Sequence, residues 1–329
     1  MNLHNSIFQK ISSNKKEKQT IKIHYKNKNF LVYIFLSNII LILIFINIYS
    51  TYIIKSRKEN ITFEKCYFAP DDSNLKIIHL IITRFMIGFW NLDDFPKRIY
   101  KNDYILNGIK VMKKYLFPSL ENQNCKKFIW VLKIGDKANI THVKSLLNLN
   151  HSFETTIIYE KDIKDYIKTI SKGFDILITT RMDYDDRIYY DAVNDVRKAV
   201  NIKKPMILYG YNKGLYYFEE NNKYYEFDRN DTKKGIMSIF ASLIVVLNSV
   251  NDTYNIYELG THMKIRKKII TSYKSFGIKE LNYEPAIFDS GGPKFVWVRQ
   301  KYSGQFHYTK MIEKKLKLCK FNLSKFYGK

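Results

Sequence analysis

The sequence predicts an α/β fold in which a mostly parallel sheet is flanked by helices. Two observations lead to this prediction. From residue 75 onward, short apolar runs of strand length alternate with segments of helical periodicity, a pattern typical of parallel sheets with crossover helices. The apolar run 176–178 lies between Gly173 and a charged cluster, as expected for a buried strand whose carboxyl end carries a binding site.

The first half of this domain predicts strands and helices in alternation. Apolar runs indicate strands at 75–85, 127–134, 153–160 and 176–180. Helical spacing of apolar residues indicates helices at 103–120, 139–147, 161–172 and 187–200. The first of these helices is expected to break at Pro118, because proline lacks a backbone donor.

The pattern changes after residue 200. Short strands are expected at 205–211, 214–219 and 223–227, joined by tight turns into an antiparallel hairpin or meander. The apolar segment 235–250 is short for a second membrane span and carries small and polar residues, so a buried helix or strand is expected there. A basic helix at 261–270, strands at 283–287 and 294–300, and a basic amphipathic tail from residue 310 complete the prediction.

The N-terminal part is organised differently. Residues 1–30 form a polar, basic tail, and residues 31–54 contain no charge and are long enough for a transmembrane helix. More lysines precede this span than follow it, so the N-terminus is expected on the cytoplasmic side of a single-pass, type II membrane protein. Residues 55–74 are expected to form a stem, and residues 75–329 the globular domain.

Composition excludes some classes of partner. The formal net charge is +24, but Lys, Asn, Ile and Tyr are abundant together and no nucleic-acid-binding motif appears, so no nucleic-acid partner is expected. The excess charge still favours anionic substrates and membrane surfaces. Cys66, Cys125 and Cys319 form no CxxC pair, which argues against a zinc site. We expect three thiols, or one disulfide if the domain faces an oxidising compartment.

The acidic cluster after the central strand is the candidate site. Asp183, Asp185 and Asp186 fall within four residues, close to Arg181. A divalent cation would relieve their repulsion at the end of a buried strand, and Mg²⁺ or Mn²⁺ usually shares such carboxylates with substrate phosphates. The alternative is that Asp185 or Asp186 caps the following helix.

Four blocks of the sequence resemble one family. They are HLIITRF at 79–85, FPSLENQNCKKFIW at 117–130, TTRMDYDD at 179–186 and FVWVRQKYSGQ at 295–305. These blocks are similar to patterns of the rhamnosyltransferase family, glycosyltransferase-like bacterial proteins with a GT-A type fold. Two features depart from that family: the N-terminal anchor, and Tyr302, which stands where the late turn of the family brings a histidine.

The resemblance implies transfer of a sugar, rhamnose by the family's label, from a nucleotide-sugar donor to a hydroxyl of a glycan or lipid-linked acceptor. Asp183 and Asp185 would hold a divalent cation, Mn²⁺ or Mg²⁺. The third ligand in many GT-A enzymes is a late histidine; here only His262 and His307 could serve, neither lies at the matching position, and His262 is kept as the candidate. The cation would neutralise the leaving diphosphate, where negative charge develops.

Three further roles follow for residues near the acidic cluster. Arg84 and Arg181 would bind phosphate or nucleotide together with Asp183, or alternatively form structural ion pairs with the acidic residues. Asp186 would position or deprotonate the acceptor hydroxyl, unless it caps a helix. His79 lies within an apolar strand and is expected to be a core histidine.

Two other functions stay open at this level. A metal-dependent phosphohydrolase would use the same carboxylates, although such enzymes usually add histidine ligands, and this chain has seven histidines, mostly outside the motifs. A non-catalytic interaction protein with a degenerate GT-A site is the second alternative, and Tyr302 is the feature that favours it.

Overall fold

In the computed structural model, the described residues are 74–87, 99–147, 150–228, 240–260, 265–289, 292–299 and 318–319. All of them belong to one compact unit, Glu64–Lys329. The expected basic tail, membrane span and stem therefore lie outside the described residues, except for Asn74. No helix in the described part of the chain is long and apolar enough to cross a membrane.

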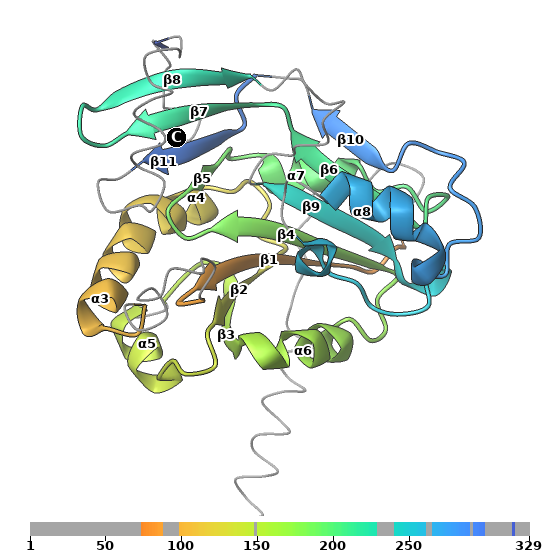
Figure 1. Cartoon of the computed structure of the whole chain (residues 1–329), viewed down its shortest axis with the longest axis horizontal. Helices are drawn as coiled ribbons and strands as arrows, with labels where there is room; N and C mark the ends of the chain where they lie inside the picture. The colour runs from red at the N-terminus through yellow and green to blue at the C-terminus, as the bar shows by residue number, and fades with distance from the viewer. Residues whose placement is uncertain are drawn as a thin grey trace, which may run out of the picture. The chain divides into compact units, whose positions relative to one another are not determined.

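A seven-stranded mixed sheet forms the centre of this unit (Figure 1). Its strand order is β10-β6-β9-β4-β1-β2-β3. The bounds are β1 Ile77–Phe85, β2 Ile129–Ile134, β3 Glu154–Tyr159, β4 Ile176–Asp183, β6 Met206–Tyr211, β9 Ala241–Val246 and β10 Ala286–Asp289. β9 runs antiparallel to its neighbours β4 and β6, whereas the other pairs are parallel. The predicted mostly parallel sheet is therefore confirmed.

Helices cover both faces of the sheet. One core cluster joins one face to α3 (Asn102–Val111), α5 (Ile140–Leu147) and α7 (Ala192–Lys198). On the opposite face, α6 (Ile163–Ile170) packs on β1, β2 and β4, and α8 (Ile265–Ser272) packs on β6 and β9. Because both faces are buried, the central strands are almost continuously apolar, which is why their sequence shows runs rather than alternation.

A second, four-stranded sheet has the order β5-β11-β7-β8. It consists of β5 (Arg187–Ile188), β11 (Phe295–Arg299), β7 (Lys213–Phe218) and β8 (Lys223–Asp228). The predicted hairpin is confirmed for β7 and β8, which are antiparallel. The expectation that 205–211 joins the same meander is wrong, because β6 pairs with β9 and β10 in the central sheet.

Two predicted helices differ from the structure. The helix expected at 187–200 begins only at Ala192, because Arg187 and Ile188 pair with β11 instead. The helix expected to break at Pro118 continues to Glu121 through a π-helical turn, Met112–Leu116, and the short helix α4, Phe117–Glu121. Pro118 is the second residue of α4, directly after this π-helical turn.

Two smaller expectations were also resolved. The apolar segment 235–250 contains the buried strand β9, one of the two elements expected there. Cys125 is disulfide-bonded rather than a thiol. Its side chain is buried beside the segment that leads into β2.

Candidate functional site at the carboxyl edge of the sheet

The candidate site lies where the strand order of the sheet reverses. From β1 the chain continues through β2 to β3 on one side, and then returns to the other side of β1 with β4. Open α/β sheets bind ligands at such a switch point, beyond the carboxyl ends of the strands. Arg84 and Asp183 are register partners at the carboxyl ends of β1 and β4. The structure therefore places two of the predicted site residues at this point.

Arg84 and Arg181 converge on one carboxylate. Arg84 Nη2 lies 3.6 Å and Arg181 Nη2 lies 3.7 Å from the same oxygen, Asp183 Oδ1. The Asp183 side chain keeps 28% of its surface exposed, whereas the side chains of Arg84 and Arg181 keep 14% and 5%. The acidic residue thus faces outward and the two guanidinium groups lie behind it.

Two residues that sequence reasoning missed complete the cluster. Lys133 lies on β2 in register with Arg84. Tyr257 follows β9 along the chain, and its ring centroid lies 4.6 Å from Lys133 Nζ, 5.2 Å from Arg84 Cζ and 5.6 Å from Arg181 Cζ. Cations at these distances from an aromatic face are attracted by its quadrupole. One ring therefore contacts cations from three adjacent strands.

A short 3₁₀ turn, η5 (Ile256–Leu259), places Tyr257 in the cluster. A capping box starts this turn, in which the Asn255 side chain accepts from the Tyr257 N–H and the Glu258 side chain accepts from the Asn255 N–H. Thr179 Oγ1 on β4 accepts from the Ile256 N–H at 2.9 Å. The Tyr257 hydroxyl donates to the Ile82 carbonyl on β1 at 2.9 Å. The turn is thereby bonded to both strands that carry the arginines.

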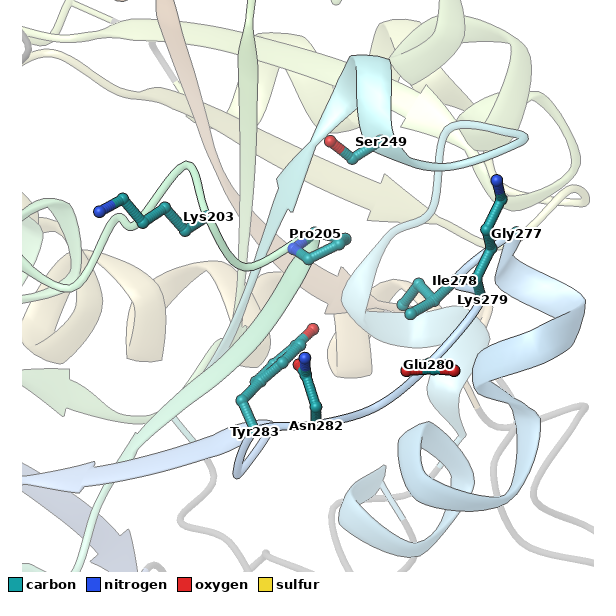
Figure 2. A pocket seen from close by; sticks show the side chains of 9 residues that line it. All are labelled: Lys203, Pro205, Ser249, Gly277, Ile278, Lys279, Glu280, Asn282 and Tyr283. Atoms are coloured by element: carbon teal, nitrogen blue, oxygen red, sulfur yellow. The ribbon is translucent and has the colours of Figure 1, made fainter.

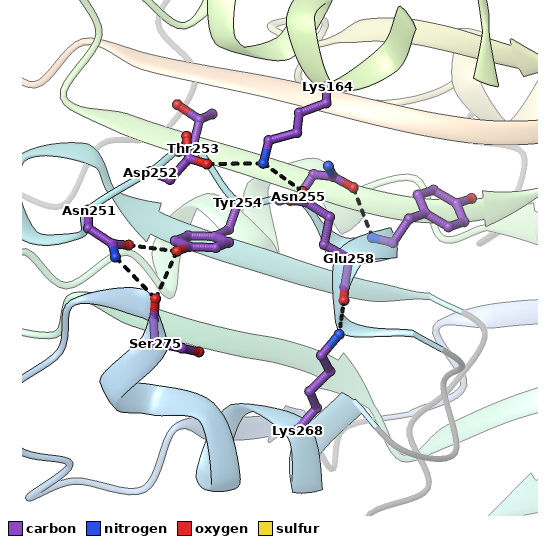
Figure 3. A network of polar contacts seen from close by, with 10 residues as sticks. Lys164, Asn251, Asp252, Thr253, Tyr254, Asn255, Glu258, Lys268 and Ser275 are labelled. Carbon is purple, nitrogen blue, oxygen red and sulfur yellow. Dashed lines mark hydrogen bonds and ion pairs between the residues drawn. The ribbon is translucent and has the colours of Figure 1, made fainter. Parts of the chain in front are cut away.

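A wider polar network supports this turn (Figure 3). Lys164 on α6 forms ion pairs with Asp252 at 3.0 Å and with Glu258 at 3.7 Å. Lys268 on α8 donates to the carbonyl of Glu258. The segment that carries Tyr257 is therefore fastened to both helices on this face of the sheet.

The cluster brings together three cations, Arg84, Lys133 and Arg181. Among the described residues, the carboxylates of Asp183 and Glu160 contact them. Burial, followed by the neighbouring arginines, lowers the pKa of Lys133 against the opposing effect of Glu160. Burial raises the pKa of Tyr257 to about 12, so the ring contributes no charge.

Arg181 has a buried donor that a ligand could use. Its Nε is buried and has no hydrogen-bond partner among the described residues. A buried donor left without a partner costs free energy, and the cost is larger for a charged group. An anionic ligand at this edge of the sheet would supply an acceptor for this donor.

The predicted metal ligands are only partly described. Asp183 is the last residue of β4 and Asp185 follows two residues later; both are half-buried, while His262 lies outside the described residues. Among the residues that the structure describes, no group of three or more His, Cys, Asp and Glu side chains could hold a metal ion. Asp183 and Asp185 still offer the one or two carboxylates with which Mg²⁺ binds alongside substrate phosphates.

Asp186 has a structural contact in this geometry. Its side chain is fully buried, and Oδ1 accepts a hydrogen bond from the Val298 N–H on β11 at 3.2 Å. It does not cap α7, which begins after Asp191. A role for Asp186 in activating an acceptor hydroxyl stays a prediction.

His79 is a core histidine, as expected. Its Nε2 lies 2.7 Å from Thr180 Oγ1, which in turn lies 2.7 Å from Ser242 Oγ, so the three side chains link β1, β4 and β9. Burial, with a smaller contribution from Arg197, lowers the pKa of His79 to about 3. The imidazole is therefore neutral at physiological pH.

A separate pocket of about 340 Å³ opens at the other edge of the sheet (Figure 2). It is lined by Pro205 and Tyr283, which precede β6 and β10, and by exposed residues such as Lys203 and Glu280. β6 runs in the same direction as β4, because both are antiparallel to β9. The pocket thus lies at the amino ends of the strands, away from the cationic cluster.

Comparisons with known proteins give distant likenesses. No protein-family model and no curated protein matches the chain. Among solved structures, HddC from Yersinia pseudotuberculosis shares 13% identity over 72% of this chain and 99% of that chain, with a TM-score of 0.34. S. aureus TarS shares 12% identity over 72% of this chain and 63% of that chain, with a TM-score of 0.37.

A third similar structure is the mannosyltransferase PcManGT from Pyrobaculum calidifontis in complex with GDP-Man and Mn²⁺. It shares 9% identity over 76% of this chain and 64% of that chain, with a TM-score of 0.40. The chain thus spans less than two thirds of TarS and of PcManGT. At identities and scores this low, the function has to be argued from the residues of the site itself.

Proposed function

We propose that this protein is a glycosyltransferase that moves a sugar from a nucleotide-sugar donor to a glycan or lipid-linked acceptor. The observation that carries the proposal is the convergence of Arg84 and Arg181 on Asp183 at the switch point of the sheet. Guanidinium groups bind phosphate oxygens in bidentate fashion. A cationic cluster with one outward carboxylate suits a diphosphate whose charge increases as the sugar leaves.

The residues of the site have distinct parts in such a reaction. Arg84 and Arg181 bind the diphosphate and stabilise the charge that develops on it, which is the step where fixed cations lower the barrier most. Tyr257 holds both guanidinium groups at the end of the sheet, so that they need not reorganise when the donor binds.

A divalent cation fits this proposal as a ligand shared between protein and donor. Asp183 and Asp185 would hold it, with oxygens of the diphosphate completing its coordination. When bound, the cation supplies further neutralisation of the leaving diphosphate. His262 remains a candidate third ligand.

The finer parts of the proposal concern the acceptor and the membrane. We propose a GT-A-like catalytic domain at 75–329 that is held by the span 31–54, with the N-terminus cytoplasmic, near a glycan or lipid-linked acceptor. Asp186 is the candidate to position the acceptor hydroxyl. Rhamnose is the candidate sugar, from the resemblance of the sequence blocks.

The first test measures the thermal stability of the full-length protein with a panel of nucleotide diphosphates and nucleotide-sugars, each with Mn²⁺ or with EDTA. A ligand that binds only the folded state raises the melting temperature by mass action. We expect one nucleotide diphosphate and its sugar conjugates to give the largest shift, and the shift to fall in Arg84→Gln and Arg181→Gln.

The outcomes separate the competing functions. A shift that needs Mn²⁺ supports a cation shared by Asp183 and Asp185, and a shift in EDTA assigns the phosphate binding to the arginines. Release of free sugar or phosphate without an acceptor would favour the phosphohydrolase. No shift with any ligand would contradict the proposal and favour a non-catalytic interaction protein.

A further inference from the structure

A second ion pair lies beside the proposed phosphate site. Lys133 Nζ donates to Glu160 Oε1 at 2.8 Å. Lys133 lies on β2, and Glu160 is the first residue after β3. The register of the sheet aligns Lys133 with Arg84, and Arg84 with Asp183. Charged side chains from four adjacent strand ends thus form one row along the carboxyl edge.

The two members of this pair differ in their exposure. The Lys133 side chain keeps 6% of its surface exposed, whereas the Glu160 side chain keeps 43%. Lys133 Nζ is fixed over the Tyr257 ring, but Glu160 starts a short 3₁₀ turn at the surface. The carboxylate therefore reaches the buried ammonium group from the solvent side, and the same approach is open to another anion.

The surroundings of Lys133 make an anionic partner necessary. Burial and the charges of Arg84 and Arg181 both lower the pKa of Lys133, and Glu160 opposes them. Removing Glu160 would leave the Lys133 ammonium group beside the guanidinium groups of Arg84 and Arg181 around one ring, without its ion-pair partner. An incoming phosphate would replace Glu160 without loss of charge pairing for Lys133.

We propose that Lys133 is a third phosphate-binding cation of the site and that Glu160 is its exchangeable counter-ion, which the diphosphate of the donor displaces. This inference rests on the proposed function, because it concerns the same diphosphate site. The exchange favours the ligand, since an exposed carboxylate regains its water shell when it leaves, while the buried ammonium group stays paired. Glu160 thereby competes with the donor for Lys133.

The experiment titrates inorganic diphosphate, and then the nucleotide diphosphate chosen by the thermal panel, into the full-length protein by calorimetry. Lys133→Met keeps an unbranched apolar stem of similar length and removes the charge; it is expected to weaken binding by about tenfold or more. Glu160→Gln removes the competing carboxylate and is expected to tighten binding several-fold. Lys133→Arg keeps the charge and should lose less affinity than Lys133→Met.

A matched pair outside the site serves as control. Arg266 Nη2 contacts Glu284 Oε2 at 3.2 Å on the surface of α8. Arg266→Gln and Glu284→Gln remove an ion pair of the same kind and should leave the affinity unchanged. Melting temperatures of all variants show whether each one is folded.

The outcomes distinguish this inference from the proposed function. If the unmodified protein binds neither inorganic diphosphate nor any nucleotide diphosphate, the proposed function fails, and this inference fails with it. If it binds them and folded Lys133→Met binds equally well, Lys133 is only a structural residue, and the proposed function stands. If Glu160→Gln binds more weakly than the unmodified protein, the exchange of counter-ions is wrong.

Discussion

Arg84 and Asp183 are register partners across the β1–β4 pair, and Arg84 Nη2 lies 3.6 Å from Asp183 Oδ1. The two residues are separated by almost a hundred positions in the chain, and parallel pairing at the switch point of the sheet brings them together. Arg181 approaches the same oxygen from within β4. Asp183 is therefore both the counter-ion of two arginines and the most exposed of the three side chains.

Replacement of Asp183 tests its part in transfer. Asp183→Ala is expected to lower the rate of sugar transfer by about 100-fold or more, because it removes a group that acts where charge develops. It should also abolish any shift in melting temperature that depends on Mn²⁺. Glu284→Ala, which removes the partner of Arg266 outside the site, is the control. Full transfer activity in Asp183→Ala would show that the assigned role is wrong.

Replacement of Tyr257 tests whether one ring organises the cations. Tyr257→Leu is expected to weaken diphosphate binding by about twofold to thirtyfold, because cation–π contacts contribute about 0.5–2 kcal/mol. Tyr257→Phe keeps the ring and removes only the hydrogen bond from the hydroxyl to the Ile82 carbonyl. Its affinity for diphosphate should therefore decrease less. Calorimetry on the full-length protein measures both.

The control for this series is Tyr254→Phe. Tyr254 belongs to the same network but its hydroxyl bonds to Asn251 and Ser275, away from the cations. It should bind diphosphate as the unmodified protein does. Equal affinity of Tyr257→Leu and the unmodified protein would contradict the proposed function of the ring.

The buried His79 predicts a loss of stability in acid. Its pKa is about 3 in the folded protein, against 6.5 for an unperturbed histidine, so between these values the unfolded chain takes up a proton that the folded chain excludes. The contribution of His79 to the free energy of unfolding is complete above about pH 6.5. It falls as the pH decreases toward 3, by up to about 1.4 kcal/mol per pH unit.

Urea denaturation at several pH values measures this effect. His79→Gln retains a polar group near Thr180 and cannot take up the proton, so the slope of unfolding free energy against pH should decrease between pH 6.5 and 3. An unchanged slope in His79→Gln would assign the acid sensitivity to other groups.

The close packing around Gly108 on α3 predicts that a larger side chain there lowers the stability of the protein. A Cβ at Gly108 would overlap the ring of Phe85, the last residue of β1, which also packs against Tyr184. Gly108→Ala is expected to destabilise the protein by about 1–3 kcal/mol, as overpacking of a core usually does. Chemical denaturation measures the change. Gly292→Ala is the control, because no atom lies within 4 Å of its added Cβ, and equal losses in both would contradict the packing argument.

The sequence by itself determined the elements of the sheet and the position of its acidic end. Apolar runs predicted β1, β2, β3 and β4 to within a few residues, because strands buried on both faces must be apolar along their length. The cluster after β4 was visible because its charges are adjacent in the chain. Arg84 was visible in the same way, as a charged residue at the end of the first apolar run.

Only the tertiary structure decided which distant residues share the site. Lys133 is an ordinary charged residue near the end of an apolar strand, and Tyr257 is one of 26 tyrosines. No local pattern connects either of them to Asp183. The parallel register and the capped turn η5 bring them together, and these depend on pairing between segments far apart in the chain.

The same distinction applies to the residues that follow Asp183. Asp186 was a candidate catalytic group or helix cap; it does not cap α7, its Oδ1 accepts from the backbone of β11, and its catalytic role stays a prediction. Arg187 and Ile188 looked helical, but pairing with β11 held them extended. Local propensity is weak compared with a set of tertiary hydrogen bonds, so the path of the chain after Asp183 was decided by a strand more than a hundred residues later.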